Sequence, residues 1–383
     1  MQVAVVSGAL AAKPWRGGAA WVRLSYVLGL RRLGWDVVFV EELSPAALVD
    51  GAGRRAELDA SENLRFFRSV VAAFGLAGRS ALLCGGRSWG LTAAECEDVA
   101  ASADVLVNVG GNLRLDAVKR RPRRKVFVDL DPGYTQAWLS AGIGDLGVEG
   151  HNTYFTVGTN VGTPGCPIPS AGLPWRHTVP PVVLDEWPAT PGPGFGRFTT
   201  VGTWRGPYGP VAIDGRELGP KGHEFRRFAR LPGPAPGSFE VALDIDEKDA
   251  ADRDRLRRHG WTVADPRAVA GHPEAFRDYV RSSGAECSPA QAVYVRTASG
   301  WVSDRTTRYL ALGRPALVQD TGFGRRIPTG EGLVTFRTVE EAVVGAESIA
   351  ADYERHAKGA RALAEEVFDS DRVLSAMLEE ARV

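Results

Sequence analysis

A segment that begins near residue 300 combines a glycine, a helix start and a basic side chain in a pattern suited to binding an anion. Gly300 precedes Ser303, which can cap a helix; Asp304 and Arg305 fall in its first turn, and Thr321 follows the next predicted strand. Free backbone N–H groups and the helix dipole make such a helix start attractive to phosphate. A cation does not suit this end of the dipole, so Arg305 is easier to explain if an anion binds beside it. An ordinary capped helix with a solvated arginine is an equally compatible alternative.

Arg205 and Lys221 are two further basic residues at positions where a loop meets a regular element. Arg205 follows a predicted strand within a glycine-rich turn, and Lys221 stands directly before a predicted helix. Fixed cations there can bind an anion and offset negative charge that develops during a reaction, which is a role that a metal ion has in other enzymes. Two solvated loop cations are the alternative. The 4 cysteines show no metal-ligand spacing, so we expect no metal and no other cofactor.

The first half of the chain contains four candidates for ligand binding and catalysis. Asp131 follows a buried strand, where ligands bind in open α/β sheets, and is a candidate base; the alternative is a helix N-cap followed by Pro132. His151 titrates near neutrality and can also act as a base, although most lone histidines are not catalytic. Gly17 and Gly18 precede a long helix and let backbone approach a ligand closely. A plain turn explains these two glycines equally well.

Short apolar runs alternate with amphipathic helical patterns, which predicts α/β units with parallel sheets. In the first half we expect strands at residues 3–7, 37–40, 81–84, 105–109, 126–130 and 153–157, the last of which closes the sheet. Helices are expected at residues 19–33, 64–74 and 92–101. Thr92 and Glu95 have the spacing of a capping box at the start of the third helix.

Residues 158–195 are rich in proline and glycine, which stiffen a connection and exclude helix, so we interpret them as a linker with one short strand at 182–184. After the linker, strands are expected at residues 198–201, 239–243, 261–264, 292–295, 315–319 and 333–336. Helices are expected at residues 222–231, 249–259, 273–282, 303–312, 339–353, 356–368 and 371–382. These patterns predict an N-terminal domain 1–180, a C-terminal domain 181–365 and a final helix 366–383.

The composition limits the classes of protein to which the chain can belong. It has 383 residues, which suits two cores. Its 46 basic and 46 acidic residues balance, so no overall field favours nucleic acid or an anionic membrane. No apolar run is long enough to span a bilayer, and the N-terminus leads into a strand pattern without a basic leader. We therefore expect a cytoplasmic monomer or homodimer with no nucleic-acid partner.

Residues 299–322, which include the turn Gly313-Arg314-Pro315, resemble the donor-binding region of GT-B glycosyltransferases, and the resemblance continues through residues 329–336. It implies two Rossmann-like doubly wound domains that face a cleft, with C-terminal helices packing back toward the N-terminal domain. The N-terminal domain would bind the acceptor through Gly17 and Gly18. In similar proteins a carboxylate of the C-terminal domain accepts hydrogen bonds from the ribose, and Glu331 is the candidate here, with an exposed turn residue as the alternative. The other expected donor contacts are Arg205, Lys221, Gly300, Ser303, Asp304, Arg305 and Thr321, with Glu286 and Ser288 near the sugar.

The resemblance breaks down at two positions. Many retaining enzymes of this fold carry a pair of glutamates across the same loop and helix. When the Gly-Arg-Pro turn is aligned, Gly300 and Arg308 occupy those positions. The roles of the glutamates therefore do not transfer to this chain, which resembles a divergent subgroup.

The resemblance implies metal-independent transfer of a sugar, as by a hexosyltransferase, from a nucleoside diphosphate sugar such as a UDP or dTDP sugar to a small molecule or glycan. The alanine-, arginine- and glycine-rich composition suits a GC-rich bacterial genome and hence natural-product glycosylation. Two alternatives share the double fold: a nucleotide-sugar epimerase and a non-catalytic, nucleotide-binding or partner-activating protein. A dehydrogenase is disfavoured because the turn after the first strand lacks G-x-G-x-x-G.

Overall fold

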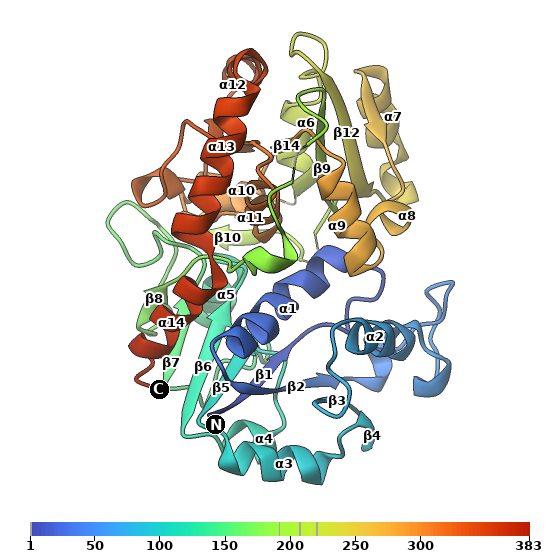
Figure 1. Ribbon diagram of the computed structural model, residues 1–383, viewed down its shortest axis with the longest axis vertical. Helices are drawn as coiled ribbons and strands as arrows, with labels where there is room; N and C mark the ends of the chain where they lie inside the picture. The colour runs from blue at the N-terminus through green and yellow to red at the C-terminus, as the bar shows by residue number, and fades with distance from the viewer. Residues whose placement is uncertain (1, 191, 207, 220) are drawn as a thin grey trace.

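The computed structural model describes residues 2–190, 192–206, 208–219 and 221–383. Two large sheets lie one above the other along the long axis, and helix α1 (Gly17–Arg32) lies where they approach each other (Figure 1). The last strand of the first sheet ends at His177, and the second sheet begins at Arg197. The chain therefore has the α/β architecture with two parallel sheets that the alternating pattern predicts.

The first sheet has the strand order β4-β3-β2-β1-β5-β6-β7-β8. Its strands are β1 (Val3–Gly8), β2 (Asp36–Leu43), β3 (Ser80–Cys84), β4 (Arg87–Gly90), β5 (Val105–Val109), β6 (Arg124–Asp129), β7 (Thr153–Thr156) and β8 (Trp175–His177). All neighbours pair in parallel except β3 and β4. The expectation that residues 153–157 close this sheet is wrong, because the short strand β8 pairs beyond β7.

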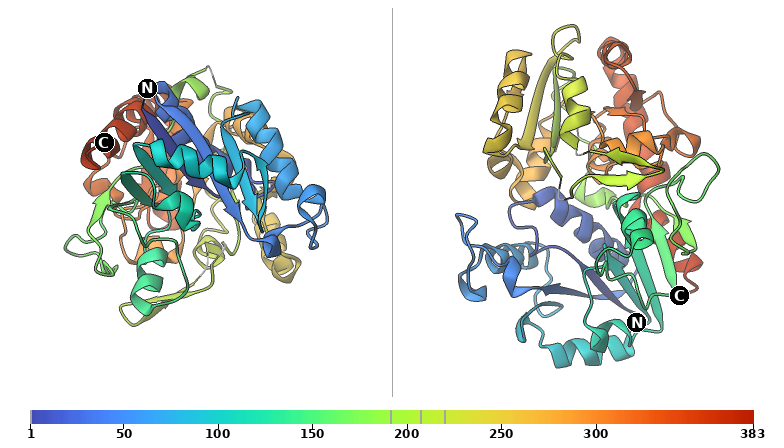
Figure 2. Two further views of the ribbon diagram at one scale, coloured as in Figure 1. Left: turned by 90° about the horizontal axis from the view of Figure 1, so that it is seen from below. Right: turned by 180° about the vertical axis from the view of Figure 1, so that it is seen from behind.

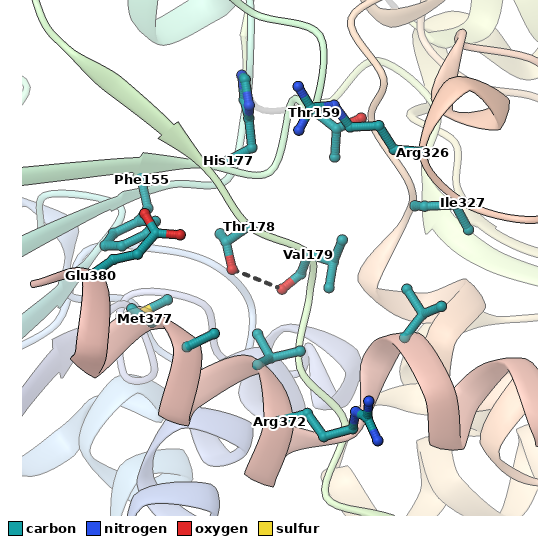
Figure 3. Close-up of a pocket in the computed structure, with 13 residues that line it drawn as sticks. Phe155, Thr159, His177, Thr178, Val179, Arg326, Ile327, Arg372, Met377 and Glu380 are labelled. Atoms are coloured by element: carbon teal, nitrogen blue, oxygen red, sulfur yellow. Dashed lines mark hydrogen bonds between the residues drawn. The ribbon is translucent and has the colours of Figure 1, made fainter.

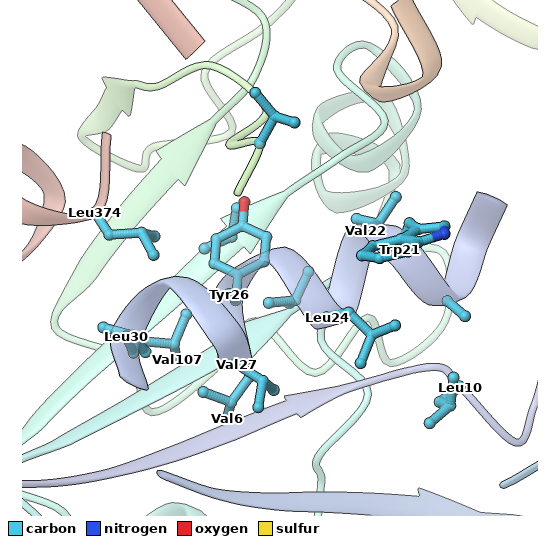
Figure 4. Close-up of a cluster of buried hydrophobic side chains, with 14 of the residues drawn as sticks. Val6, Leu10, Trp21, Val22, Leu24, Tyr26, Val27, Leu30, Val107 and Leu374 are labelled. Atoms are coloured by element: carbon cyan, nitrogen blue, oxygen red, sulfur yellow. The ribbon is translucent and has the colours of Figure 1, made fainter. Parts of the chain in front are cut away.

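Helices cover both faces of the first sheet, since alternate strand residues point to opposite sides. Ala4 and Val6 pack in the cluster around α1 and α2 (Glu62–Ala73), whereas Val5 packs with α3 (Ala93–Ser102) and α4 (Asp116–Lys119). Figure 4 shows the apolar side of α1 lying over β1 and β5. The predicted capping box at the start of α3 is present.

The second sheet has the strand order β13-β12-β9-β14-β15-β16, in which the first strand lies at the centre, as in doubly wound folds. Its strands are β9 (Arg197–Thr203), β12 (Ser238–Asp244), β13 (Trp261–Val263), β14 (Ala285–Ser288), β15 (Ala316–Gln319) and β16 (Leu333–Phe336). Residues 292–295, expected to form a strand, are instead in helix α10 (Ala292–Arg296). The missing strand is β14, whose sequence Ala-Glu-Cys-Ser lacks the apolar run of a typical buried strand.

The remaining elements surround the second sheet or connect it to the first. They are helix α5 (Tyr134–Ala141), the hairpin β10 (Val211–Ile213) and β11 (Arg216–Leu218), and helices α6 (Lys221–Arg227), α7 (Ala250–Arg258), α8 (Pro266–Ala270), α9 (Pro273–Arg281), α11 (Asp304–Ala311), α12 (Val339–Ala351) and α13 (Tyr353–Leu363). Among the described helices, none is long and apolar enough to cross a membrane.

The last helix, α14 (Ser370–Glu380), lies against the first sheet's helix α1, so the chain crosses back, as the resemblance implies. At the crossing, Val182 of the linker pairs with Asp369. A Cβ on Gly29 of α1 would lie 2.5 Å from a methyl group of Leu374, which shows how closely α1 and α14 pack. The C-terminus consequently lies beside the lower sheet, as the view from behind also shows (Figure 2).

Candidate active site

The carboxyl ends of the two sheets face each other. Asp131, which follows β6, accepts hydrogen bonds of 3.2 Å from Tyr208, which follows β9, and from Tyr294 of α10. Arg16, in the loop after β1, forms a 3.4 Å ion pair with Asp244 at the end of β12. Because ligands of open α/β sheets bind beyond the carboxyl ends of the strands, the space between these edges is the candidate active site.

On the second sheet's edge, Arg305 joins three segments. Its Nε donates to Glu286 Oε1 at 2.6 Å and its Nη1 to the Val201 carbonyl at 2.7 Å, and Nη2 donates to Ser288. Glu286 therefore compensates the cation in the first turn of α11, and no bound anion is needed to explain it. The second oxygen of Glu286 is buried without a hydrogen-bond partner among the described residues. Glu286 and Ser288 thus hold Arg305 in the edge that faces the cleft.

Lys221, the first residue of α6, lies beside this group. A Cβ on Gly202 would be 3.1 Å from Lys221 Nζ, so the glycine leaves room for the ammonium. Burial lowers the pKa of Lys221 to about 7, and the neighbouring Arg305 adds to this effect. No ion pair among the described residues includes Lys221. An ammonium that is buried without a carboxylate partner is suited to an anionic ligand.

On the first sheet's edge, the loop after β1 is held by Glu41 of β2. The Glu41 carboxylate accepts hydrogen bonds from the backbone N–H groups of Leu10, Ala11 and Ala12 at 2.9, 2.6 and 2.8 Å. Burial raises the pKa of Glu41 to about 7, against the effect of these hydrogen bonds. The loop therefore presents the next residue, Lys13, from a fixed backbone.

Lys13 and Arg23 are the cations of this edge. Burial, and then the nearby Arg23, lowers the pKa of Lys13 to about 8. Arg23 is 4% exposed; its Nη1 donates to the Ala19 carbonyl at 3.2 Å, and its Nε has no partner among the described residues. A Cβ on Gly8 would lie 2.7 Å from Arg23 Cγ, so glycine at the end of β1 makes room for this side chain.

Asp304, at the start of α11, interacts electrostatically with cations of both edges, namely Lys13, Arg23 and Lys221. Lys13, Arg23 and Lys221 form a cationic cluster, and none of the three takes part in an ion pair among the described residues. Three carboxylates interact with them electrostatically and are also outside any such ion pair, namely Asp304, Asp131 and Glu41. Cations that have no direct carboxylate partner can accommodate an anion such as a diphosphate.

Several solved structures share this arrangement of sheets over the whole chain. The α-glucosyltransferase AGT in complex with UDP matches at 11% identity over 100% of both chains, with a TM-score of 0.59. HepE from Anabaena in complex with UDP and glucose matches at 11% identity over 99% of both chains, with a TM-score of 0.56. AviGT4, involved in avilamycin A biosynthesis, matches at 15% identity over 100% of this chain and 97% of its own, with a TM-score of 0.55. The chain has the GT-B fold. No family model and no curated protein sequence matches it.

Four residues near α11 that we expected to contact the donor form hydrogen bonds with other residues of the protein: Ser303, Arg305, Gly300 and Thr321. Ser303 caps α11 and accepts the Arg305 N–H at 3.3 Å. Gly300 donates its N–H to the Thr321 carbonyl at 2.8 Å, and a Cβ on Gly300 would lie 2.3 Å from the hydroxyl of Thr159. Gly300 therefore joins the two halves of the molecule through Thr159, and Thr321 holds the Gly300 backbone within the second half. Arg305 contacts Glu286, Val201 and Ser288 at the carboxyl edge of the second sheet, and Asp304 lies beside the cationic cluster.

Arg205 does not join that cluster. Its guanidinium forms a bidentate pair with Asp249, at 2.6 and 2.9 Å, although its side chain is 59% exposed. This pair satisfies the charge of Arg205 beside α7, whereas Lys221 is buried without an ion-pair partner among the described residues. We predicted that Arg205 and Lys221 face the diphosphate. In the structure only Lys221 lies beside Arg305.

Glu331 lies at the wrong edge of the second sheet for a ribose contact. It precedes β16, which runs parallel to β15, so it stands at the amino end of the strands. Its side chain is 60% exposed and lies 3.8 Å from Arg355 of α13. The expected role of Glu331 is therefore not supported, because ligands bind at the carboxyl edge.

His151 is also misplaced for a catalytic base, since it precedes β7 at the amino edge of the first sheet. It is buried, its Nδ1 lies 2.8 Å from the Val148 carbonyl, and its Nε2 lies 3.3 Å from the Asn108 side chain. Burial lowers the pKa of His151 to about 4, so it is neutral at physiological pH. We conclude that His151 packs the interior, while Asp131 stays a candidate base. Asp131 does not cap α5, whose N-cap is Gly133.

The space beside Gly17 and Gly18 is filled by other residues of the protein and leaves no room for an acceptor. A Cβ on Gly17 would lie 2.1 Å from the His272 carbonyl oxygen, and one on Gly18 would lie 3.1 Å from the ring of Phe276. Both neighbours belong to the second half of the chain, at the start of α9. These glycines therefore let α1 and α9 approach each other, which sequence spacing alone could not show.

A cavity of about 620 Å³ lies apart from the cationic cluster. Its lining includes Phe155, His177, Arg326 and Met377, from β7, β8, the loop after β15 and α14 (Figure 3). Among the described residues, no group of three or more His, Cys, Asp or Glu side chains could hold a metal ion. The 4 cysteines are free thiols.

Proposed function

We propose that this protein transfers a sugar from a nucleoside diphosphate sugar to a small-molecule or glycan acceptor. The observation that carries the proposal is the presence of three cations without ion-pair partners among the described residues between the facing edges: Lys13 and Arg23 on one side, Lys221 on the other. A diphosphate is a polyanion that suits such a site, and the GT-B fold is shared with proteins described in complex with UDP.

In this proposal, Lys221 contacts the diphosphate, and Arg305 is a positioning residue that its own partners hold in place. As the glycosidic bond breaks, negative charge grows on the leaving diphosphate, and a preorganised cation stabilises that charge. The fixed side-chain cations would make a metal ion unnecessary. Asp131 is the candidate base, because its carboxylate lies in the cleft and the hydroxyl groups of Tyr208 and Tyr294 fix its orientation.

We further propose that the transferred sugar is a hexose, that the donor is a UDP or dTDP sugar and that the acceptor is a natural product. We also propose that the protein is a cytoplasmic monomer or homodimer. One similar α-glucosyltransferase is described in complex with UDP and a 13-mer DNA. The balanced charge of the present chain favours an acceptor other than DNA, so a DNA duplex belongs in the acceptor panel as a direct test.

Product analysis with radiolabelled UDP- and dTDP-sugars in EDTA tests this function. We expect acceptor-dependent transfer by the wild-type protein, at least 100-fold slower transfer by Lys221→Ala, and transfer within threefold of wild type by Arg205→Ala. Arg205→Ala is the matched control, since it removes a cation that is already paired with Asp249. Transfer that requires added divalent metal would contradict the proposal.

The two alternatives give different products. An epimerase would convert the donor sugar without any acceptor, and a non-catalytic protein would bind the nucleotide without turnover. Gly300 and Arg308 stand where many retaining enzymes of this fold carry two glutamates, and this difference supports testing for a non-catalytic protein. Either outcome across the acceptor panel would replace sugar transfer as the function.

A further inference from the structure

One cavity is separate from the cationic cluster and is lined by both halves of the chain. Its volume is about 620 Å³, within the range of roughly 300–1,000 Å³ that small-molecule sites occupy. Its walls come from the ends of β7 and β8, from the loop after β15 and from α14 (Figure 3). A molecule bound there would touch the first sheet, the second sheet and the helix that crosses between them.

Most of the cavity wall is apolar. Phe155 and Ile327 stand on opposite sides (Figure 3). Val373, Ala376 and Met377 of α14 also line the cavity. Covering such a wall is favourable by roughly 25 cal/mol for each Å² of apolar surface removed from water. The cavity therefore suits the hydrocarbon part of a ligand.

Positive charge is added at the cavity by two arginines. Arg326 and Arg372 are exposed cavity-lining residues, and neither takes part in an ion pair or side-chain hydrogen bond among the described residues. The acidic Glu380 at the other end of the cavity is 3.3 Å from Arg176, which offsets its charge. In Figure 3 the Arg326 guanidinium lies across from His177, beside Thr159.

We propose that this cavity binds a small amphiphilic acid, with its carboxylate at Arg326 and its hydrocarbon chain along Phe155 and α14. A charge-assisted hydrogen bond from arginine to a carboxylate would orient the molecule, and the apolar wall would supply affinity. The inference does not rest on the proposed function, because the cavity lies outside the cationic cluster.

Binding at this cavity stabilises the contact between the two halves of the chain. Thr159 lines the cavity, and its hydroxyl donates to the Gly300 carbonyl at 3.0 Å, three residues before the Ser303 cap of α11. A ligand that binds the native state alone raises its melting temperature by mass action. We therefore expect the amphiphile to raise the melting temperature of the protein without displacing a nucleoside diphosphate.

Calorimetric titration with decanoate and with 1-decanol, which has the same chain but no charge, tests the site. We expect decanoate to bind at least fivefold more tightly than decanol. Arg326→Ala should weaken decanoate binding at least fivefold and leave decanol binding unchanged. Arg325→Ala is the matched control, because Arg325 carries the same charge at the next position but does not line the cavity; its affinity for decanoate should equal that of wild type.

A second variant tests the location independently of charge. Ala376 is an exposed residue of α14 that faces the cavity, so Ala376→Trp fills the space without disturbing the buried core. We expect it to abolish binding of both probes while the melting temperature stays within 2 °C of wild type. Equal binding of decanoate and decanol, an equal loss in Arg325→Ala and Arg326→Ala, or full binding by Ala376→Trp would overturn the proposal. So would binding to phosphatidylglycerol vesicles without any binding of monomeric decanoate.

Discussion

The guanidinium of Arg308 on α11 donates to the Ser25 hydroxyl on α1 at 2.8 Å, which links the two halves of the molecule. The same Nη2 donates to the Trp21 carbonyl at 3.1 Å, and Arg308 is 1% exposed. When the Gly-Arg-Pro turn is aligned, Arg308 stands where many retaining enzymes of the GT-B fold carry a glutamate. In this chain the residue anchors one half to the other.

Arg308→Ala should lower the free energy of unfolding by about 3 kcal/mol, because it removes the charge-assisted hydrogen bonds of a buried guanidinium to the Ser25 hydroxyl and to the Trp21 carbonyl, which keeps only the Ser25 hydroxyl as a side-chain donor. Arg308→Glu, which restores the residue of the similar enzymes, should destabilise at least as much, since a carboxylate would then face carbonyl oxygens. Urea unfolding measures both. The exposed Arg65 offers a control, and Arg65→Ala should stay within about 0.5 kcal/mol of wild type. A glutamate variant as stable as wild type would refute the anchoring role.

Lys221→Met should raise the melting temperature while it weakens nucleotide binding. Burial holds the pKa of Lys221 near 7 in the folded chain, below its ordinary value of 10.5, so the folded state is penalised for carrying this charge. That penalty is fully present below pH 7 and fades as the pH rises from 7 toward 10.5, where the unfolded chain still binds the proton. Calorimetry should therefore show the largest stability gain at pH 6 and a smaller gain at pH 9. A gain that does not depend on pH would argue against a buried ammonium.

Gly17→Ala should destabilise the protein by about 1–3 kcal/mol, because the new methyl group would collide with the His272 carbonyl and force α1 and α9 apart. Gly51→Ala is the control, since a Cβ there would come no closer than 3.6 Å to its nearest neighbour. Thermal unfolding of the two variants separates the specific contact from a general cost of replacing glycine. Equal melting temperatures would show that the close approach does not exist in solution.

His151 should make the protein less stable in acid and should have no part in turnover. Its folded-state pKa of about 4 lies below the unfolded value of 6.5, so the unfolded chain binds more protons between these pH values. Stability should fall as the pH decreases from 6.5 to 4, by at most about 1.4 kcal/mol per pH unit from this group. Urea unfolding of His151→Gln should show a shallower loss over that range, and its pH profile of turnover should match wild type. A profile that loses one titration step would restore His151 as a base.

The fold was largely readable from the sequence, because each long apolar run and each amphipathic stretch specifies one element by local periodicity. β14 was missed for a local reason: it contains Glu286 and Ser288, polar residues that belong to the Arg305 network and interrupt the apolar pattern. Residues 292–295 are β-branched and aromatic enough to favour a strand, yet tertiary packing makes them helical.

The site was less predictable, because it depends on contacts between distant segments. The Arg305–Glu286 pair can be predicted only if the pairing of β14 with β15 is known. The contact of Gly17 with His272 joins residues far apart in the chain. Glu331 and His151 could have been excluded, since each precedes its strand and so lies at the edge where ligands do not bind. Lys13 and Arg23 carried no motif, and only the facing edges reveal them as part of the cationic cluster.

Calorimetric titration of UDP and dTDP into the EDTA-treated protein tests the central claim, that cations between the facing edges bind a diphosphate without metal. We expect binding by wild type and by Arg205→Ala, and at least tenfold weaker binding by Lys221→Ala and by Lys13→Ala. Binding that appears only with magnesium, or that is lost in Arg205→Ala and kept in Lys221→Ala, would contradict the account.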